Sequence, residues 1–209
     1  MKESAPGHCF PNPIGRMILC SMEEVIGKNG LSAALNLAGL APLIESFSCT
    51  VEEKPFSFEM LGTLLGALEL AYGPRGGRGL ALRSGRVFFN HLVREYGVEM
   101  GLTASAFRLM PAEKRVRAVL DALATFFNQH TDQVVRIMEA DQKILWQAET
   151  CPLCWQRHES EPVCQLTVGM LQEGAYWASG GKIYHVVEEA CIACGDPACI
   201  VALDRIPLS

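Results

Sequence analysis

Long apolar runs, a leader segment and an excess of positive charge are all missing from this sequence of 209 residues. No stretch reaches the roughly 18 uninterrupted apolar residues of a membrane-spanning helix, and residues 1–13 lack the apolar core of a secretory signal. We therefore expect a cytoplasmic protein without a membrane span. The net charge of −5 argues against a surface that tracks phosphate backbones, so we expect no nucleic-acid partner.

The signatures of common catalytic sites are missing as well. The chain has no G-x-S-x-G elbow, no His-Glu-x-x-His pair and no strand followed by a dinucleotide fingerprint. Glycines and arginines between Gly73 and Gly79 precede a predicted helix, and such a segment can bind an anion through free helix amides. An exposed loop that connects two helices explains the same residues. The missing catalytic signatures favour a binding protein over a self-sufficient enzyme.

Hydrophobic periodicity divides the chain into a helical first part and a mixed second part. Apolar residues recur at helical spacing in six segments, at 14–26, 32–40, 55–72, 79–96, 111–130 and 163–179. Alternating patterns predict a hairpin over 134–147 and two strands over 182–188 and 199–203. Helices first and then β-β-α-β-β predict an α+β fold with a small antiparallel sheet.

Nine cysteines are distributed unevenly along the chain. Because thiols stay reduced in the cytoplasm, this set predicts metal ligands and buried thiols rather than disulfides. Cys9, Cys20 and Cys49 are scattered, and we expect each to be a buried thiol without a ligand. The other six lie within the last 59 residues and are candidate metal ligands: Cys151, Cys154, Cys164, Cys191, Cys194 and Cys199.

Two different sets of these residues suit a tetrahedral metal site. One set is the two C-x-x-C pairs, which begin at Cys151 and Cys191 and have 36 residues between them. The other set takes both ends of the last turn with residues from the preceding helix and strand: Cys164, Glu188, Cys191 and Cys199. The first C-x-x-C pair is then left to bind a second metal, act as a redox pair or clasp the start of the helix.

A longer pattern around these residues resembles a known family. The segment Pro162-Val163-Cys164, a glycine-containing helix and the signature E-x-x-C-x-x-C-G-x-x-x-C that begins at Glu188 resemble the 4-vinyl reductase, or hydrocarbon-binding, domain family over about residues 150–205. The family includes the sensory domains of phenol-responsive activators. The resemblance implies a structural Zn²⁺ cofactor, with the middle Cys194 left out and four ligands that leave no open position. These ligands are Cys164, Glu188, Cys191 and Cys199.

Glu189 is an alternative to Glu188, because adjacent residues of a strand face opposite sides. The resemblance also implies a fold like that of the TRAPP subunits, in which helices cover one face of an antiparallel sheet, enclose an apolar pocket and often form a homodimer. We expect residues 1–13 to be a tail and residues 14–209 to be a single ligand-binding domain. Candidate ligand-binding residues are His91, Phe88 and Trp146, which combine aromatic surface with one polar group.

The expected function is a sensor or carrier of an apolar, aromatic or amphipathic small molecule. The alternative is an accessory or catalytic protein of tetrapyrrole metabolism, which the family name suggests. The sensor relatives carry an ATPase and a DNA-binding module, and this chain shows neither, so we expect any signal to pass to a separate partner.

Overall fold

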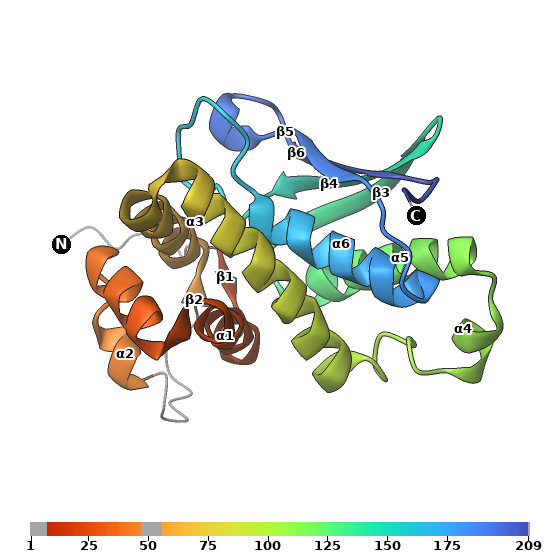
Figure 1. Cartoon of the computed structure of the whole chain (residues 1–209), viewed down its shortest axis with the longest axis horizontal. Helices are drawn as coiled ribbons and strands as arrows, with labels where there is room; N and C mark the ends of the chain where they lie inside the picture. Colours follow the sequence, from red (N-terminus) through yellow and green to blue (C-terminus); the bar gives the residue numbers. More distant parts are fainter. Residues whose placement is uncertain (1–7, 47–55, 209) are drawn as a thin grey trace.

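The computed structural model describes residues 8–46 and 56–208, which form an α+β fold (Figure 1). Its helices are α1 (Asn12–Leu37), α2 (Pro42–Ser46), α3 (Phe58–Tyr96), α4 (Ser105–Leu109), α5 (Ala112–His130) and α6 (Gln165–Ser179). A short 3₁₀ turn covers Ile192–Cys194. The fold class predicted from the sequence is confirmed. None of the helices in the described part of the chain is long and apolar enough to cross a membrane.

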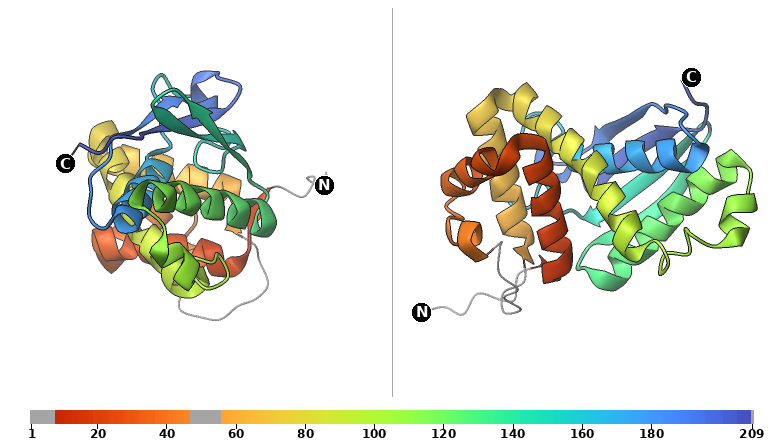
Figure 2. Two further views of the ribbon diagram at one scale, coloured as in Figure 1. Left: turned by 90° about the vertical axis from the view of Figure 1, so that its right-hand side faces the viewer. Right: turned by 60° about the horizontal axis from the view of Figure 1, so that its bottom comes forward.

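Four strands form the main sheet in the order β3-β4-β6-β5, and every neighbouring pair is antiparallel. These strands are β3 (Val134–Ala140), β4 (Lys143–Thr150), β5 (Val186–Ala190) and β6 (Cys199–Asp204). The helices α5 and α6 lie along one face of this sheet (Figure 2). The predicted β-β-α-β-β order is therefore confirmed. The strand β5 begins later than predicted, because Gly180 and Gly181 first turn the chain with positive φ angles.

The two long helices α1 and α3 each contain one kink. Gly27 and Gly73 leave the helical conformation with a φ of 74°, which favours glycine, and the helix resumes directly afterwards. The segments 14–26 and 32–40, predicted as separate helices, therefore belong largely to α1, which ends at Leu37, and 55–72 and 79–96 belong largely to α3. Pro74 suits the resumed helix, because proline is favoured in a first turn whose N–H groups lack intrahelical partners.

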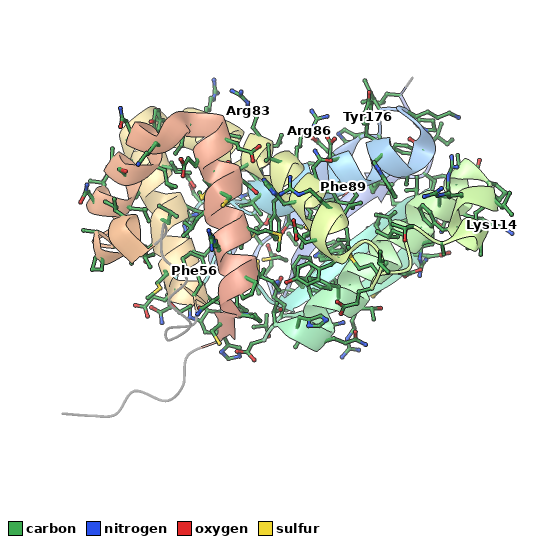
Figure 3. All side chains as sticks on the ribbon, turned by 90° about the horizontal axis from the view of Figure 1, so that it is seen from below. Phe56, Arg83, Arg86, Phe89, Lys114 and Tyr176 are labelled. Carbon is green, nitrogen blue, oxygen red and sulfur yellow. The ribbon has the colours of Figure 1, made fainter. Side chains whose placement is uncertain are left out.

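The prediction of a connecting loop between Gly73 and Gly79 is therefore wrong. These residues are helical after Gly73, and Arg78 is already paired with Glu69 and Glu161. Arg86, farther along the same helix, extends outward from α3 (Figure 3) and pairs with Glu173. Arg78, one of the basic side chains that suggested an anion site, thus holds neighbouring segments of the chain together, and so does Arg86.

The helices α3 and α6 cross in backbone contact. A Cβ atom placed on Gly85 would lie 2.0 Å from the carbonyl oxygen of Leu166, and one on Gly169 would lie 1.9 Å from that of Leu82. Both positions are buried, so glycine is required for the two helices to approach this closely. The crossing fixes the start of α6, which carries Cys164, against the middle of α3.

A second, two-stranded sheet pairs β1 (Cys9–Phe10) with β2 (Phe56–Ser57) and was not predicted. Phe56 lies beside α1 (Figure 3), where its Cβ would be 2.4 Å from a Cβ on Gly15. Phe10 is buried as well. Cys9 and Cys20 are half-buried rather than fully buried, and Cys49 lies outside the described residues.

Candidate metal centre and ligand-binding residues

Three segments bring five cysteines and one glutamate together beside α6. The segment after β4 contributes Cys151 and Cys154, the start of α6 contributes Cys164, and β5 with the following turn and β6 contributes the rest. All six side chains are buried: Cys151, Cys154, Cys164, Glu188, Cys191 and Cys199. They form two groups of four whose ligand atoms lie within 4.8 Å of one another, and Cys164 and Cys199 belong to both groups.

The sulfur atoms are spaced as metal-bound thiolates are. The Sγ atom of Cys164 lies 3.8 Å from that of Cys191 and 3.7 Å from that of Cys199, and these last two are 3.9 Å apart. A metal–sulfur bond of about 2.3 Å in a tetrahedron places neighbouring sulfur atoms roughly 3.8 Å apart. Cys151 and Cys154 complete the cluster, since each lies 3.4 Å from one shared sulfur, that of Cys164 and Cys199 respectively.

The segment between β4 and α6 is held in place by ion pairs and close packing. The guanidinium of Arg157 donates to Glu69 of α3 at 2.7 Å and to Glu159 at 2.8 Å. Trp155 packs edge-on against Phe58. Its carbonyl oxygen approaches α3 at Gly62, where an added Cβ atom would lie only 2.8 Å from that oxygen. These contacts fold the segment back onto α3 and bring its two cysteines to the cluster.

The turn between β5 and β6 is shaped by residues between its cysteines. Gly195 has a φ of 97°, which L-residues with side chains rarely adopt. The carboxylate of Asp196 accepts from the backbone N–H of Cys191 at 2.8 Å, and the N–H of Ile192 points at the sulfur of Cys199 at 3.3 Å. An N–H group directed at sulfur stabilises a thiolate more than a neutral thiol.

Glu188 faces the cluster and Glu189 faces solvent. One oxygen of Glu188 accepts from the backbone N–H of Cys164 at 2.7 Å, while its Oε1 atom is buried without a hydrogen-bond partner among the described residues. Glu189 instead forms an exposed ion pair with Lys143. Strand alternation thus selects Glu188, whose unpartnered oxygen marks a position where a cation fits.

Proton affinities within the cluster are strongly unequal. Burial, followed by the charge of Cys191, raises the pKa of Glu188 to about 8. Cys154 raises the pKa of Cys191, but hydrogen bonds from Cys164 and Cys199 outweigh it and bring the value to about 6. Hydrogen bonds from Cys151 and its neighbours raise the pKa of Cys164 well above its usual value. Such contacts make neighbouring thiols share protons, and a bound metal ion replaces those protons.

The structure brings the four residues of the predicted site together. Cys194 is exposed and lies outside both groups of ligand atoms, which disfavours pairing the two C-x-x-C motifs as one site. Sequence spacing missed that Cys151 and Cys154 join the same cluster. Their C-x-x-C spacing was the available signal, but it did not show which other cysteines they would meet.

Two of the three predicted ligand-binding residues lie near each other in the core. Phe88 on α3 and Trp146 on β4 are both buried, and each packs on Phe127 of α5, with ring centroids 6.4 and 6.2 Å away. His91 lies elsewhere. Its Nε2 atom is 2.7 Å from a carboxylate oxygen of Glu24 in α1, and its Nδ1 atom contacts the guanidinium of Arg94.

Two hollows occur on other parts of the described surface. One, of about 240 Å³, is lined by Phe107, Trp177, Arg108 and Arg115 among others, and the two aromatic rings stack with centroids 5.6 Å apart. The other, of about 320 Å³, lies between α3, α6 and β5 and reaches Glu188 of the cysteine cluster. The first offers an aromatic surface beside positive charge, and the second borders the cluster at Glu188 alone among its residues.

The fold is similar to solved structures of ligand-sensing domains. An H-NOX protein from Shewanella oneidensis in the Fe(II)NO ligation state matches with a TM-score of 0.57 and 12% identity over 90% of this chain and 97% of that one. An H-NOX structure from a study of heme distortion matches with 0.58 and 8% over 95% and 97%. The phenol-responsive sensory domain of the transcription activator PoxR, with phenol, matches with 0.52 and 20% over 74% and 79%.

These similarities show the fold alone. No protein-family model matches the sequence, so membership of the 4-vinyl reductase family is not confirmed, and no curated protein sequence matches it either. The comparisons contradict the expectation of Zn²⁺ as the cofactor, because the similar structures that point to a cofactor are described by heme and its Fe(II) state. The cysteine cluster itself does not assign zinc to this chain.

Neither of the two hollows fits a heme. Iron in heme is held by side chains such as histidine. In this structure His91, His130 and His185 each pair with a carboxylate, and the ring of His8 lies tilted against that of Trp155 with centroids 4.7 Å apart. Neither of the two hollows contains a histidine. Their volumes also lie at or below the lower end of the range for ligand pockets, about 300–1,000 Å³.

Proposed function

We propose that residues 14–209 form a small-molecule sensor or carrier domain. The observation that carries this proposal is the aromatic packing of Phe88, Phe127 and Trp146 between α3, α5 and β4, in a fold similar to a phenol-sensing domain. Buried aromatic rings that meet between helices and a sheet offer matching surface to a flat apolar ligand. Neither hollow is lined by these rings, so the proposal is restricted to compact ligands that a local opening of the core can admit. This disfavours the alternative in tetrapyrrole metabolism.

Phe88 and Trp146 would contact the ring of the ligand, and His91 would bind a hydroxyl group on it. Each role requires a local rearrangement. Phe88 and Trp146 must separate from Phe127, and His91 must exchange Glu24 for the ligand. Because aromatic side chains in a core can change rotamer, a ligand can select such a minor open state. We expect the signal to reach a second copy of the chain or a separate partner.

The test is a titration of phenol against the full chain, followed by tryptophan fluorescence and thermal unfolding. Phenol at ten times its Kd stabilises by about 1.4 kcal/mol, which raises Tm by roughly 3–6 °C. Trp146→Phe should abolish the fluorescence change, whereas Trp177→Phe, at the hollow beside Phe107, should retain it. The reverse pattern would move the ligand to that hollow, and no response in any variant would refute a phenolic ligand.

We further propose that Cys164, Glu188, Cys191 and Cys199 hold a metal ion that ties α6 to the β5–β6 turn. The support is the set of sulfur spacings, the unpartnered Oε1 atom of Glu188 and the burial of all four residues. Elemental analysis of first-row transition metals in the reduced, untagged chain identifies the ion. Cys191→Ser should lower both the metal content and Tm, while Cys194→Ser, at the exposed neighbour, should change neither.

A further inference from the structure

The cysteine cluster contains more donors than one tetrahedral ion can use. Either group of four completes a tetrahedral site, and the remaining two donors still touch the cluster. If the ion takes Cys164, Glu188, Cys191 and Cys199, then Cys151 and Cys154 are left 3.4 Å from ligand sulfurs. One divalent ion would therefore leave two donors protonated or leave a large negative charge in a buried site, which is costly.

Two tetrahedral sites that share one edge use all six donors. The four outer donors each bind one ion, and the two shared donors each bind both ions. Cys164 and Cys199 belong to both groups and lie 3.7 Å apart, so both ions can reach both sulfurs. The sulfur atoms of Cys151 and Cys154 group with this shared pair in one set of four, and the ligand atoms of Glu188 and Cys191 group with it in the other. A thiolate sulfur has several lone pairs and can bind two metal ions at once.

We propose that this cluster is a binuclear metal–thiolate centre in which Cys164 and Cys199 bridge two thiophilic metal ions. The first ion is completed by Cys151 and Cys154, and the second by Glu188 and Cys191. The inference rests on the metal centre proposed above and adds a second ion to it. Soft thiolate donors select thiophilic transition metals over Mg²⁺ or Ca²⁺.

The surroundings of the two bridging sulfurs suit their double role. Cys164 precedes the first turn of α6, where free N–H groups and the helix dipole favour negative charge. Cys199 receives the N–H of Ile192 at 3.3 Å. The hollow between α3, α6 and β5 borders Glu188, which is the residue of the cluster nearest to it. The ion on Cys151 and Cys154 would also tie the segment after β4 to the final hairpin, which the mononuclear site proposed above does not.

Titration of the reduced, metal-free full chain with Co²⁺ tests the proposal. Sulfur-to-cobalt charge-transfer absorption should rise until two equivalents are bound. The electron paramagnetic resonance signal at one equivalent should weaken as the second ion binds, because bridging sulfurs couple the two spins. Saturation at one equivalent overturns the binuclear centre but preserves the mononuclear site. No charge-transfer band at all overturns both proposals.

Variants assign the two positions. Cys151→Ser with Cys154→Ser should bind one equivalent, and so should Glu188→Gln with Cys191→Ser, whereas Cys194→Ser should still bind two. Circular dichroism shows which variants fold, and the wild-type stoichiometry and spin coupling decide the question if either double variant does not. Two equivalents without spin coupling would place the second ion away from the shared sulfurs and overturn the bridged arrangement.

Discussion

The crossing of α3 and α6 makes Gly169→Ala the sharpest test of the fold. The added Cβ atom would lie 1.9 Å from the carbonyl oxygen of Leu82 and 2.8 Å from its carbonyl carbon. Favourable contacts between carbon atoms begin at about 3.5 Å, so the two backbones must move apart by roughly 1.5 Å. The clash is with backbone on both sides, and no flexible side chain can move away to relieve it.

The expected cost follows from two opposing effects. Overpacking a tight interface costs about 1–3 kcal/mol, and rigid backbone on both sides places this site near the upper limit. Alanine recovers about 1 kcal/mol of helix propensity relative to glycine. The net loss is therefore about 2 kcal/mol, which lowers Tm by roughly 4–8 °C for a chain of this size. Urea and thermal unfolding of the full chain measure it.

Gly66→Ala is the matched control, since it changes the same residue type in α3 where no atom lies within 4 Å of the new Cβ. It should leave stability unchanged or raise it by about 0.5–1 kcal/mol. If Gly169→Ala is as stable as Gly66→Ala, the two helices do not cross in backbone contact and the reasoning fails.

Three other changes test the surroundings of the site. Gly195→Ala places a side chain at a φ of 97° and should cost about 1 kcal/mol in urea unfolding, with a looser turn between β5 and β6. Glu69→Ala removes the carboxylate that Arg78 and Arg157 share, so we expect a loss of about 2 kcal/mol. Hydrogen bonding and charge from Arg205 lower the pKa of Glu139 below 4.5, so this pair stabilises the fold at neutral pH and its contribution disappears as pH falls through the lowered pKa. Glu139→Gln should therefore unfold slightly more easily than the wild type at pH 7 and equally at about pH 2, and salt should reduce the difference.

The sequence predicted helices well and predicted their continuity poorly. A helical stripe over 111–130 or 163–179 reflects burial of one face, and the structure has α5 and α6 there. At Gly27 and Gly73 the pattern indicated a helix end, but only one residue leaves the helical conformation. A glycine marks the break in the local sequence whether the helix then resumes or ends. Whether the chain then continues or turns away depends on what packs against the second half.

The cysteine cluster was predicted in part for a similar reason. Alternation along β5 separates a buried Glu188 from an exposed Glu189, and this rule operates within one element. The position of Cys151 and Cys154 depends on Arg157 reaching Glu69, far away in the sequence. Spacing rules compare cysteines that are close along the chain, so they treated this pair as a separate motif.

His91 and Phe88, grouped as candidate ligand-binding residues, contact different elements in this structure. Positions three apart on a helix project into the same broad face, so periodicity alone does not distinguish their surroundings. In the structure α3 lies between two layers of the molecule. Phe88 meets Phe127 of α5, whereas His91, one turn later, meets Glu24 of α1. A helix that is buried on several sides has neighbouring positions that contact different elements, and only the tertiary arrangement decides which element each one meets.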